Sequence, residues 1–309
     1  MSVTNDRAKK EARAGLLFAL PWFIGFSVFL GYPLIKALYN SFTDFSILNP
    51  PVFIGTKNYV DLVQDKLFYQ SLGNTLYVAF FSVPLSTVVA LGLAMLLNTK
   101  VKGQAFYRTF FFLPALVPAV PLAILWLWLF NGEQGIINTM MIEPVGTFLN
   151  STLGTHLPTN INFLGDKAYA KSVLVLMSMW TTGHAMVIYL AGLQEVPKPL
   201  YEAADIDGAS AWQRTRMVTL PLLSPVIMFN VIMAIIGSLQ YFTQAYVMFP
   251  GGAPEQSTYL YTMYIFDSAF RDLRMGYASA MGWVMFLIIL LLTNAALKFF
   301  DSKVHYEGG

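Results

Sequence analysis

The chain has 309 residues, of which 56% are hydrophobic and only 12% are charged. A water-soluble domain normally carries about 25% charged residues, so the composition excludes an ordinary soluble protein. The formal net charge is +2, and no basic stripe interleaved with aromatic residues is present, which argues against a nucleic-acid partner. Cysteine is absent, which excludes disulfides, cysteine-ligated metals and a cysteine nucleophile.

The apolar residues fall into long runs, each able to cross a hydrocarbon layer of about 30 Å as a helix. Because backbone N–H and C=O groups find no water in lipid, each run is predicted to be helical. The six runs lie near residues 15–38, 73–97, 106–130, 170–192, 222–247 and 276–300. The sequence therefore predicts an all-α polytopic membrane protein with about six transmembrane helices, in a single domain over residues 1–309.

The first run follows a basic segment, as the apolar part of a cleaved signal peptide would. It is longer than the ~7–15 apolar residues of a signal peptide, and no small-residue cleavage site closes it. We therefore expect an uncleaved first span.

Proline residues and the loops between runs add detail to this plan. Pro114, Pro118 and Pro121 are expected to kink the third span. Residues 41–72 are predicted to form a turn and a short amphipathic helix, and residues 131–169 form the longest loop. Aromatic spacing within residues 250–275 indicates an interfacial helix.

Lysine and arginine residues near the ends of the runs set the orientation. With the N-terminus inside the cell, twelve of these residues flank the inner ends and six flank the outer ends. The positive-inside rule then places both termini in the cytoplasm. Residues 194–221, between the fourth and fifth runs, are expected on the same side.

This inner segment is charged, although the chain is otherwise apolar. Pro199 suits the first turn of a helix, and Gly208 suits the left-handed turn that ends one. Ser210 and Gln213 have the spacing of a capping box that begins a second helix. Connections between packed helices need only about 2–8 residues, so the longer rigid pair suits docking of a separate soluble motor. The alternative is a well-capped interhelical loop.

Polar residues within the apolar runs mark a substrate pathway or contacts between helices. At about 100° per residue, four residues of the fifth run share one face: Asn230, Gly237, Tyr241 and Gln244. Amides and an aromatic hydroxyl suit a neutral polyhydroxylated ligand, and the alternative is hydrogen bonding between helices. Trp180 and His184, one turn apart in the fourth run, are candidates for the same cavity, although His184 equally suits simple packing.

The segment 201–221 also contains a spaced set of residues: Glu202, Ala203, Ala204, Gly208, Val218, Thr219, Leu220 and Pro221. Their spacing resembles the EAA motif, which reads EAA, three residues, G, nine residues, I-x-L-P, with valine here in place of isoleucine. The motif is typical of permease subunits of binding-protein-dependent ABC importers. Residues 73–98 and 100–138 likewise resemble permeases for sugars and glycerol-phosphate, and most of all the first, maltose-type permease of the pair.

The resemblance implies the type I ABC importer permease fold with a cytoplasmic coupling helix pair, formed by residues 194–221. It implies that Glu202 contacts a groove on an ATPase subunit, that Gly208 forms the turn, and that Leu220 and Pro221 lead back into the membrane. It further implies a bacterial or archaeal inner membrane, a second homologous permease, an ATPase dimer that binds ATP and Mg, and an extracytoplasmic solute-binding protein. The expected function is import of a sugar or oligosaccharide by alternating access.

Two other functional classes are an enzyme and an ion-coupled secondary transporter. The chain lacks a phosphate-binding G-x-x-x-x-G-K-[ST] loop and the H-E-x-x-H and G-x-S-x-G motifs. It is therefore predicted not to be an enzyme, with no catalytic residue, metal or cofactor of its own. An ion-coupled secondary transporter of a neutral polar solute is the alternative function. It would need charged residues inside the spans, whereas Glu133, Asp267 and Asp272 lie in outer segments.

Overall fold

The computed structural model of the protein describes residues 2–99 and 102–301. The chain divides into two compact units, residues 1–65 with 265–286 (unit 1) and residues 66–264 with 287–309 (unit 2). Lys100 and Lys303, which count among the basic residues at the inner ends of the runs, lie outside the described residues. The single permease domain expected over the whole chain stays a prediction.

Unit 1 begins with a long apolar helix and ends in a small polar junction. Its elements are α1 (Ser2–Phe26), the π-helical turn η1 (Ser27–Gly31), α2 (Tyr32–Ser41), β1 (Thr43–Asp44), β2 (Val52–Phe53) and α3 (Lys57–Gln64). Two further helices, α15 (Tyr261–Phe270) and α16 (Met275–Asp301), contribute residues to both units. The turn and short helix expected within residues 41–72 are thus confirmed, with a two-stranded ladder in addition.

The junction of unit 1 is held by backbone groups. Thr43 pairs with Phe53 across the antiparallel ladder. The buried side chain of Asn58 donates from Nδ2 to the carbonyl oxygens of Ser41 and Thr43, both at 2.9 Å. These bonds fix α3 against the end of α2 and the start of β1, because Ser41 is the last residue of α2 and its carbonyl is left free where the helix ends.

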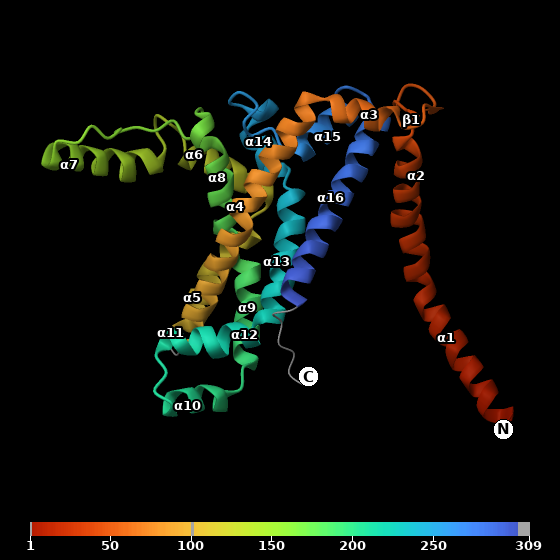
Figure 1. Cartoon of the computed structure of the whole chain (residues 1–309), viewed down its shortest axis with the longest axis horizontal. Helices are drawn as coiled ribbons and strands as arrows, with labels where there is room; N and C mark the ends of the chain where they lie inside the picture. Colours follow the sequence, from red (N-terminus) through yellow and green to blue (C-terminus); the bar gives the residue numbers. More distant parts are fainter. Residues whose placement is uncertain (1, 100–101, 302–309) are drawn as a thin grey trace. The chain divides into compact units, whose positions relative to one another are not determined.

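Unit 2 contains the remaining elements. In chain order they are α4 (Lys66–Leu97), α5 (Gln104–Phe112), η2 (Leu113–Leu116), α6 (Ala119–Leu129), η3 (Asn138–Ile142), α7 (Glu143–Leu153), α8 (Lys167–Trp180), α9 (Gly183–Glu195), α10 (Lys198–Ile206), α11 (Ala211–Arg214), η4 (Thr215–Thr219), α12 (Leu220–Leu222), α13 (Ser224–Leu239), α14 (Thr243–Met248) and η5 (Pro250–Gly252). Figure 1 shows α10 and α11 at one end of α9 and α13, and α7 at the other end of the unit.

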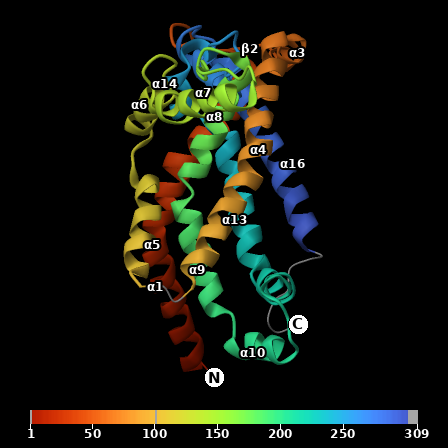
Figure 2. The same cartoon turned by 90° about the vertical axis from the view of Figure 1, so that its left-hand side faces the viewer.

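The core of unit 2 forms around α4, which packs against α8, α9 and α13; α4, α9 and α13 are also visible in Figure 2. Ala90 and Ala94 of α4 are completely buried beside Tyr189 of α9. Small residues of this kind let membrane helices approach closely. Gly192 of α9 serves the same purpose, because a Cβ there would lie 2.8 Å from Cδ1 of Leu223.

The described residues hold four helical segments long and apolar enough to span a membrane: Ala12–Ser41, Lys66–Leu97, Ser224–Met248 and Met275–Phe300. Two further candidates are bent pairs. Gln104–Leu116 and Ala119–Leu129 meet at 98°, and Lys167–Trp180 and Gly183–Glu195 meet at 42°. If each pair is one span the total is six, in agreement with the expected number.

The kink expected from the prolines of the third run is confirmed, with Pro118 as the N-cap of α6. Interruptions also occur in the fourth and fifth runs. The fourth run is interrupted at Thr181 and Thr182, and the fifth at residues 240–242. Side-chain hydroxyls stabilise both interruptions: Thr182 Oγ1 donates to the carbonyl of Met179 at 3.0 Å, and Thr262 Oγ1 donates to that of Tyr241 at 2.7 Å.

The close approach of α16 to β1 generates a stability prediction. A Cβ on Gly276 would lie 2.1 Å from the carbonyl oxygen of Thr43, so Gly276→Ala requires a backbone shift. We expect a loss of about 1–3 kcal/mol, as is typical of overpacking, measured as a lower Tm of the purified protein in detergent.

Gly282→Ala, in the same helix, is the matched control for this variant. No atom lies within 4 Å of the Cβ position at Gly282, and alanine is the better helix former by about 1 kcal/mol. The control is expected to keep or raise the Tm. Equal melting temperatures for the two variants would contradict the packing assigned to Gly276.

Candidate functional site

Two short helices, α10 and α11, connect α9 to α13. Lys198 begins α10 and Pro199 lies in its first turn, where the missing N–H has no intrahelical partner to lose. The helix ends at Ile206, and Gly208 follows with φ of 72°. The left-handed turn expected at Gly208 is therefore confirmed.

The end of α10 is a Schellman motif made by the residues of the EAA segment. The N–H of Ala209 donates to the carbonyl of Ala204 at 2.9 Å, and the N–H of Gly208 donates to that of Asp205 at 3.1 Å. These two bonds satisfy carbonyls that the last helical turn leaves free. Ala204 thus contributes its backbone as well as its small side chain.

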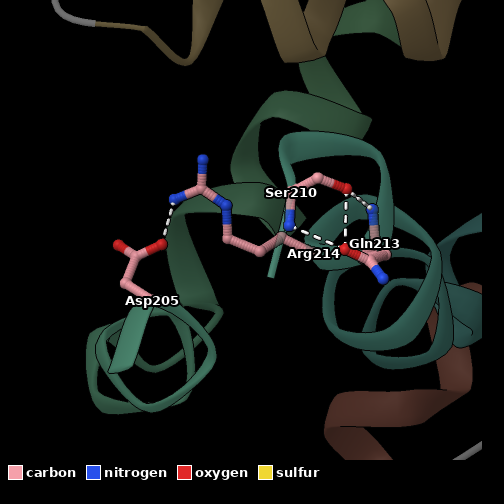
Figure 3. A network of polar contacts seen from close by, with 4 residues as sticks. All are labelled: Asp205, Ser210, Gln213 and Arg214. Atoms are coloured by element: carbon pink, nitrogen blue, oxygen red, sulfur yellow. Dashed lines mark hydrogen bonds and ion pairs between the residues drawn. The ribbon is translucent and has the colours of Figure 1, made fainter. Parts of the chain in front are cut away.

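The start of α11 is a complete capping box, as the spacing of Ser210 and Gln213 predicts. The Ser210 N–H donates to Gln213 Oε1 at 2.8 Å, and the Gln213 N–H donates to Ser210 Oγ at 3.4 Å (Figure 3). An ion pair between Arg214 and Asp205, at 2.5 Å, joins α11 back to α10.

Typical free energies indicate which of these features fixes the geometry of α10 relative to α11. Both partners of the ion pair are partly exposed, and exposed ion pairs contribute only about 0–1 kcal/mol. An N-cap contributes typically ~1 kcal/mol. A left-handed residue other than glycine costs roughly 1–2 kcal/mol. The backbone turn at Gly208 and the caps therefore determine the geometry more than the ion pair does.

The helix pair is continuous with α13. The hydroxyls of Tyr201 in α10 and Thr219 in η4 lie 3.0 Å apart, and Thr219 is buried. Leu220 and Pro221 form the start of α12, which leads directly into α13. The helix pair is therefore joined to α13 by η4 and α12 and by this part-buried contact between two hydroxyls.

The outer surface of the pair is exposed. Glu202 and Ala203 are exposed on α10. Three large apolar side chains are also exposed: Ile206 of α10 (87%), Trp212 of α11 (69%) and Met217 of η4 (70%). Exposed apolar patches of this kind mark interaction surfaces. The apolar residues were missed in the sequence, although their position in a charged inner segment is the signal that would have found them.

Two adjoining cavities lie among α4, α8, α9 and α13. Their volumes are about 380 and 220 Å³, and they share Ser86, Ser178, Thr181 and Ala234. The polar residues that line one or both are Ser82, Ser86, Thr87, Ser178, Thr181, Thr182, His184, Tyr189, Asn230, Ser238 and Tyr241. The polar groups in the cavity walls are thus chiefly hydroxyls, although most of the cavity surface is apolar.

Some of the residues predicted for the substrate pathway line these cavities, and others do not. Asn230 and His184 line the larger cavity, and Gly237 and Tyr241 line the smaller one. Gln244 belongs to neither, because the interruption at residues 240–242 breaks the helical periodicity that placed it on the Asn230 face.

Trp180 also lines neither cavity. It is half exposed and packs edge-on against Trp126, with ring centroids 6.3 Å apart. The interruption after it removes the one-turn relation to His184 that a continuous helix would give. The serine and threonine residues of α4 and α8 were missed, although Ser82 and Ser86 recur at helical spacing in an apolar run.

Hydrogen bonding differs among the lining residues. Asn230 Nδ2 donates to the carbonyl of Val226 at 2.9 Å, and the Tyr241 hydroxyl donates to Met177 Sδ at 3.2 Å. The Tyr189 hydroxyl is buried and makes no hydrogen bond of normal geometry, although the Thr87 side chain lies near it. Leaving a buried hydroxyl unpaired costs about 1–3 kcal/mol, which favours a ligand or water at this point.

His184 does not lie in a metal site. Its ring packs on Phe112 with centroids 5.1 Å apart. Over residues 2–99 and 102–301, no three His, Asp or Glu side chains come together as a metal ion would require.

The turn at Gly208 provides the second prediction. No atom lies within 4 Å of its Cβ position, so Gly208→Ala is strained only by the left-handed backbone, by about 1–2 kcal/mol. Asparagine adopts this conformation more readily, so Gly208→Asn is the control. We expect faster amide hydrogen exchange in residues 198–214 of the alanine variant than in the asparagine variant. Equal exchange in both would contradict the role of the turn.

The chain is similar to known transport proteins in sequence and in structure. Residues 82–306 match the family described as binding-protein-dependent transport system inner membrane component. A probable ABC transporter permease of Bacillus subtilis strain 168, YesP, is 38% identical over 97% of this chain and 94% of its own length. The lactose transport system permease LacF of Rhizobium radiobacter is 34% identical, over 94% of each chain.

Among solved structures, a bacterial ABC transporter involved in import of the acidic polysaccharide alginate has a similar chain. Its TM-score is 0.79 at 23% identity, with 96% of this chain and 99% of that chain covered. This similarity shows the fold, which is that of an ABC importer permease. Because a family model covers most of the length and relatives exceed 30% identity over nearly all of it, the chain belongs to the inner-membrane components of binding-protein-dependent transport systems.

Proposed function

We propose that this chain is the permease subunit of an ATP-driven importer that passes a neutral sugar or oligosaccharide across the inner membrane by alternating access. One structural relation carries the proposal. The exposed α10–α11 pair continues through α12 into α13, whose Asn230 and Ala234 form the wall of the larger cavity. Movement of the α10–α11 pair would thereby change the position of the cavity wall.

The chemistry of the cavities supports a carbohydrate substrate. Hydroxyl and amide groups donate and accept hydrogen bonds, as a sugar requires, and Phe229 and Tyr241 add aromatic surface. The residues lining the two cavities include no Asp, Glu, Lys or Arg, which favours an uncharged ligand. Relatives are described as permeases for lactose, for starch degradation products and for trehalose or maltose.

Energy for transport is proposed to come from a partner. The sequence has no phosphate-binding loop, so ATP and Mg would be bound by an ATPase dimer that receives α10 in a groove. Glu202 would lie at that contact, beside the exposed Ile206. Closure of the ATPase dimer would move the helix pair as a rigid body, since the Gly208 turn and the capping box fix it.

The assembly is completed by two further proposed partners. A second homologous permease would form the other wall of the pathway, and an extracytoplasmic solute-binding protein would deliver the sugar. In this arrangement both termini and the α10–α11 pair face the cytoplasm. The structure of an alginate importer with a similar chain includes a periplasmic protein bound to an alginate pentasaccharide, which supports a binding-protein partner.

The ion-coupled secondary transporter finds no support. The named relatives are ABC transporter permeases, and the cavity lining holds no carboxylate to carry a coupling ion.

Charge reversal at the proposed contact is expected to uncouple the transporter. Glu202→Lys should lower sugar uptake by about tenfold or more, since contacts central to an interface are worth ~2 kcal/mol or more. Uptake and ATPase activity of the reconstituted complex are the measurements. Glu195→Lys, also an exposed acid but outside the motif, is the control. Wild-type transport by both variants would exclude Glu202 from the contact.

Removal of the unpaired hydroxyl in the cavity tests the substrate site. Tyr189→Phe should not lower the Tm, because the hydroxyl has no hydrogen bond in the cavity wall to lose. It should raise the sugar concentration for half-maximal uptake about 2- to 12-fold, the equivalent of one neutral hydrogen bond of ~0.5–1.5 kcal/mol.

Tyr169→Phe, at a partly exposed position on α8, is the control for this variant. Its apparent affinity is expected to equal that of the wild type. A stable Tyr189→Phe variant with unchanged affinity would show that the hydroxyl does not contact the sugar.

A further inference from the structure

The segment between α6 and α8 has an unusual composition for a loop at the end of a membrane protein. Residues 135–165 contain one acidic residue, Glu143, and no lysine or arginine. Surfaces that face water normally carry about 25% charged residues. The segment is instead rich in apolar side chains, and it forms a helix, α7, that the sequence did not predict.

Three sides of α7 have different surroundings. Gly146 faces the returning chain, where a Cβ would lie 2.9 Å from the carbonyl oxygen of Pro158. Val145 and Phe148 share a second side and are 56% and 64% exposed. Glu143 and Thr147, four residues apart, share a third side that is exposed and polar. The helix is therefore amphipathic, with an apolar side that no part of the described chain covers.

Two asparagines hold this segment in place without using that apolar side. Asn138 Nδ2 donates to the carbonyls of Gly132 and Ile161 at 3.1 and 2.9 Å. Asn150 Nδ2 donates to the carbonyl of Leu157 at 2.9 Å, and the N–H of Leu157 donates back to Asn150 Oδ1 at 2.8 Å. The loop satisfies its polar groups internally, which leaves the side of Val145 and Phe148 free for an apolar environment.

The apolar side of α7 lies at the same end of unit 2 as an aromatic cluster. The rings of Trp126 and Phe130 stack with centroids 5.1 Å apart, and Phe163 lies edge-on to Phe130 at 5.4 Å. Aromatic residues gather in this way at membrane–water interfaces. Ile124 and Trp128 of α6 are exposed apolar residues in a bent helix pair that counts as a candidate span.

We propose that α7 lies in the membrane–water interface, at the end of unit 2 opposite the α10–α11 pair. Met141, Val145 and Phe148 contact lipid acyl chains, and Glu143 and Thr147 face water. Figure 1 shows α7 running crosswise to α4 and α8, the direction required of a helix that lies along the membrane surface. Apolar sides of such helices penetrate about 5–10 Å into the boundary region.

Lipid fits this side better than a protein partner does. Contact surfaces between proteins carry a polar rim and roughly one hydrogen bond per 100–200 Å². The side of Val145 and Phe148 offers neither charge nor hydrogen-bonding side chain apart from Thr152. Of the functional conclusions above, this proposal requires only that the protein lies in a membrane. It does not depend on which substrate is transported.

Single-cysteine labelling tests the proposal, because the natural chain has no cysteine. Phe148→Cys and the neighbouring control Thr147→Cys are each spin-labelled in the complete transporter in lipid vesicles. Accessibility is then measured to oxygen, which partitions into lipid, and to a water-soluble nickel chelate. We expect the label at position 148 to respond to oxygen and the label at position 147 to respond to nickel.

Two results would overturn the proposal. Nickel access at position 148 equal to that at position 147 would place the apolar side in water. Protection of position 148 from both reagents would show that a protein partner covers it. Retained uptake verifies that each labelled transporter is folded, and Val145→Cys on the same side replaces Phe148→Cys if that variant does not assemble.

Discussion

The absence of water inside a lipid bilayer is the constraint on which the rest of this structure depends. A helix can be interrupted there only where protein or a polar cavity satisfies the freed backbone groups. The interruptions in the fourth and fifth runs meet this condition. Thr181 and Thr182 line the larger cavity and Tyr241 lines the smaller one. The broken helices and the cavities therefore coincide, and the interruptions place hydroxyl groups in a cavity surface that is otherwise mainly apolar.

The same constraint keeps charge out of the cavity lining, which includes no Asp, Glu, Lys or Arg. Charged residues are frequent instead in the segment that forms α10 and α11, where exposed carboxylates and guanidinium groups remain hydrated. The stiffness of that segment comes from backbone geometry at Gly208 and from the Ser210 capping box rather than from the ion pair of Asp205 with Arg214. Because α11, η4, α12 and α13 follow one another along the chain, a short helical stretch links the α10–α11 pair to Asn230 in the cavity wall.

Sequence patterns predicted the parts of the structure that local physics controls. Proline at positions 114, 118 and 121 predicted the bend of the third run, and Ser210 with Gln213 predicted the start of α11. The interruption at residues 240–242 has no proline or glycine, and it is stabilised by Thr262 from a later element, so it has no local signal. The same interruption explains why Gln244 lies away from the predicted face. α7 was missed because its apolar side is short and because Asn138 and Asn150 hold it through bonds to Ile161 and Leu157, which lie beyond the helix.

In the proposed mechanism, the nucleotide state of a partner ATPase controls access to the cavities through the α10–α11 pair. Thiol accessibility of Ser178→Cys, a position shared by both cavities in a chain that has no natural cysteine, measures this directly. A membrane-impermeant thiol reagent is added to the extracytoplasmic side of the reconstituted complex. We expect rapid labelling when the ATPase is trapped with ATP and little labelling without nucleotide. Equal labelling in the two states would contradict control of the cavities by the ATPase.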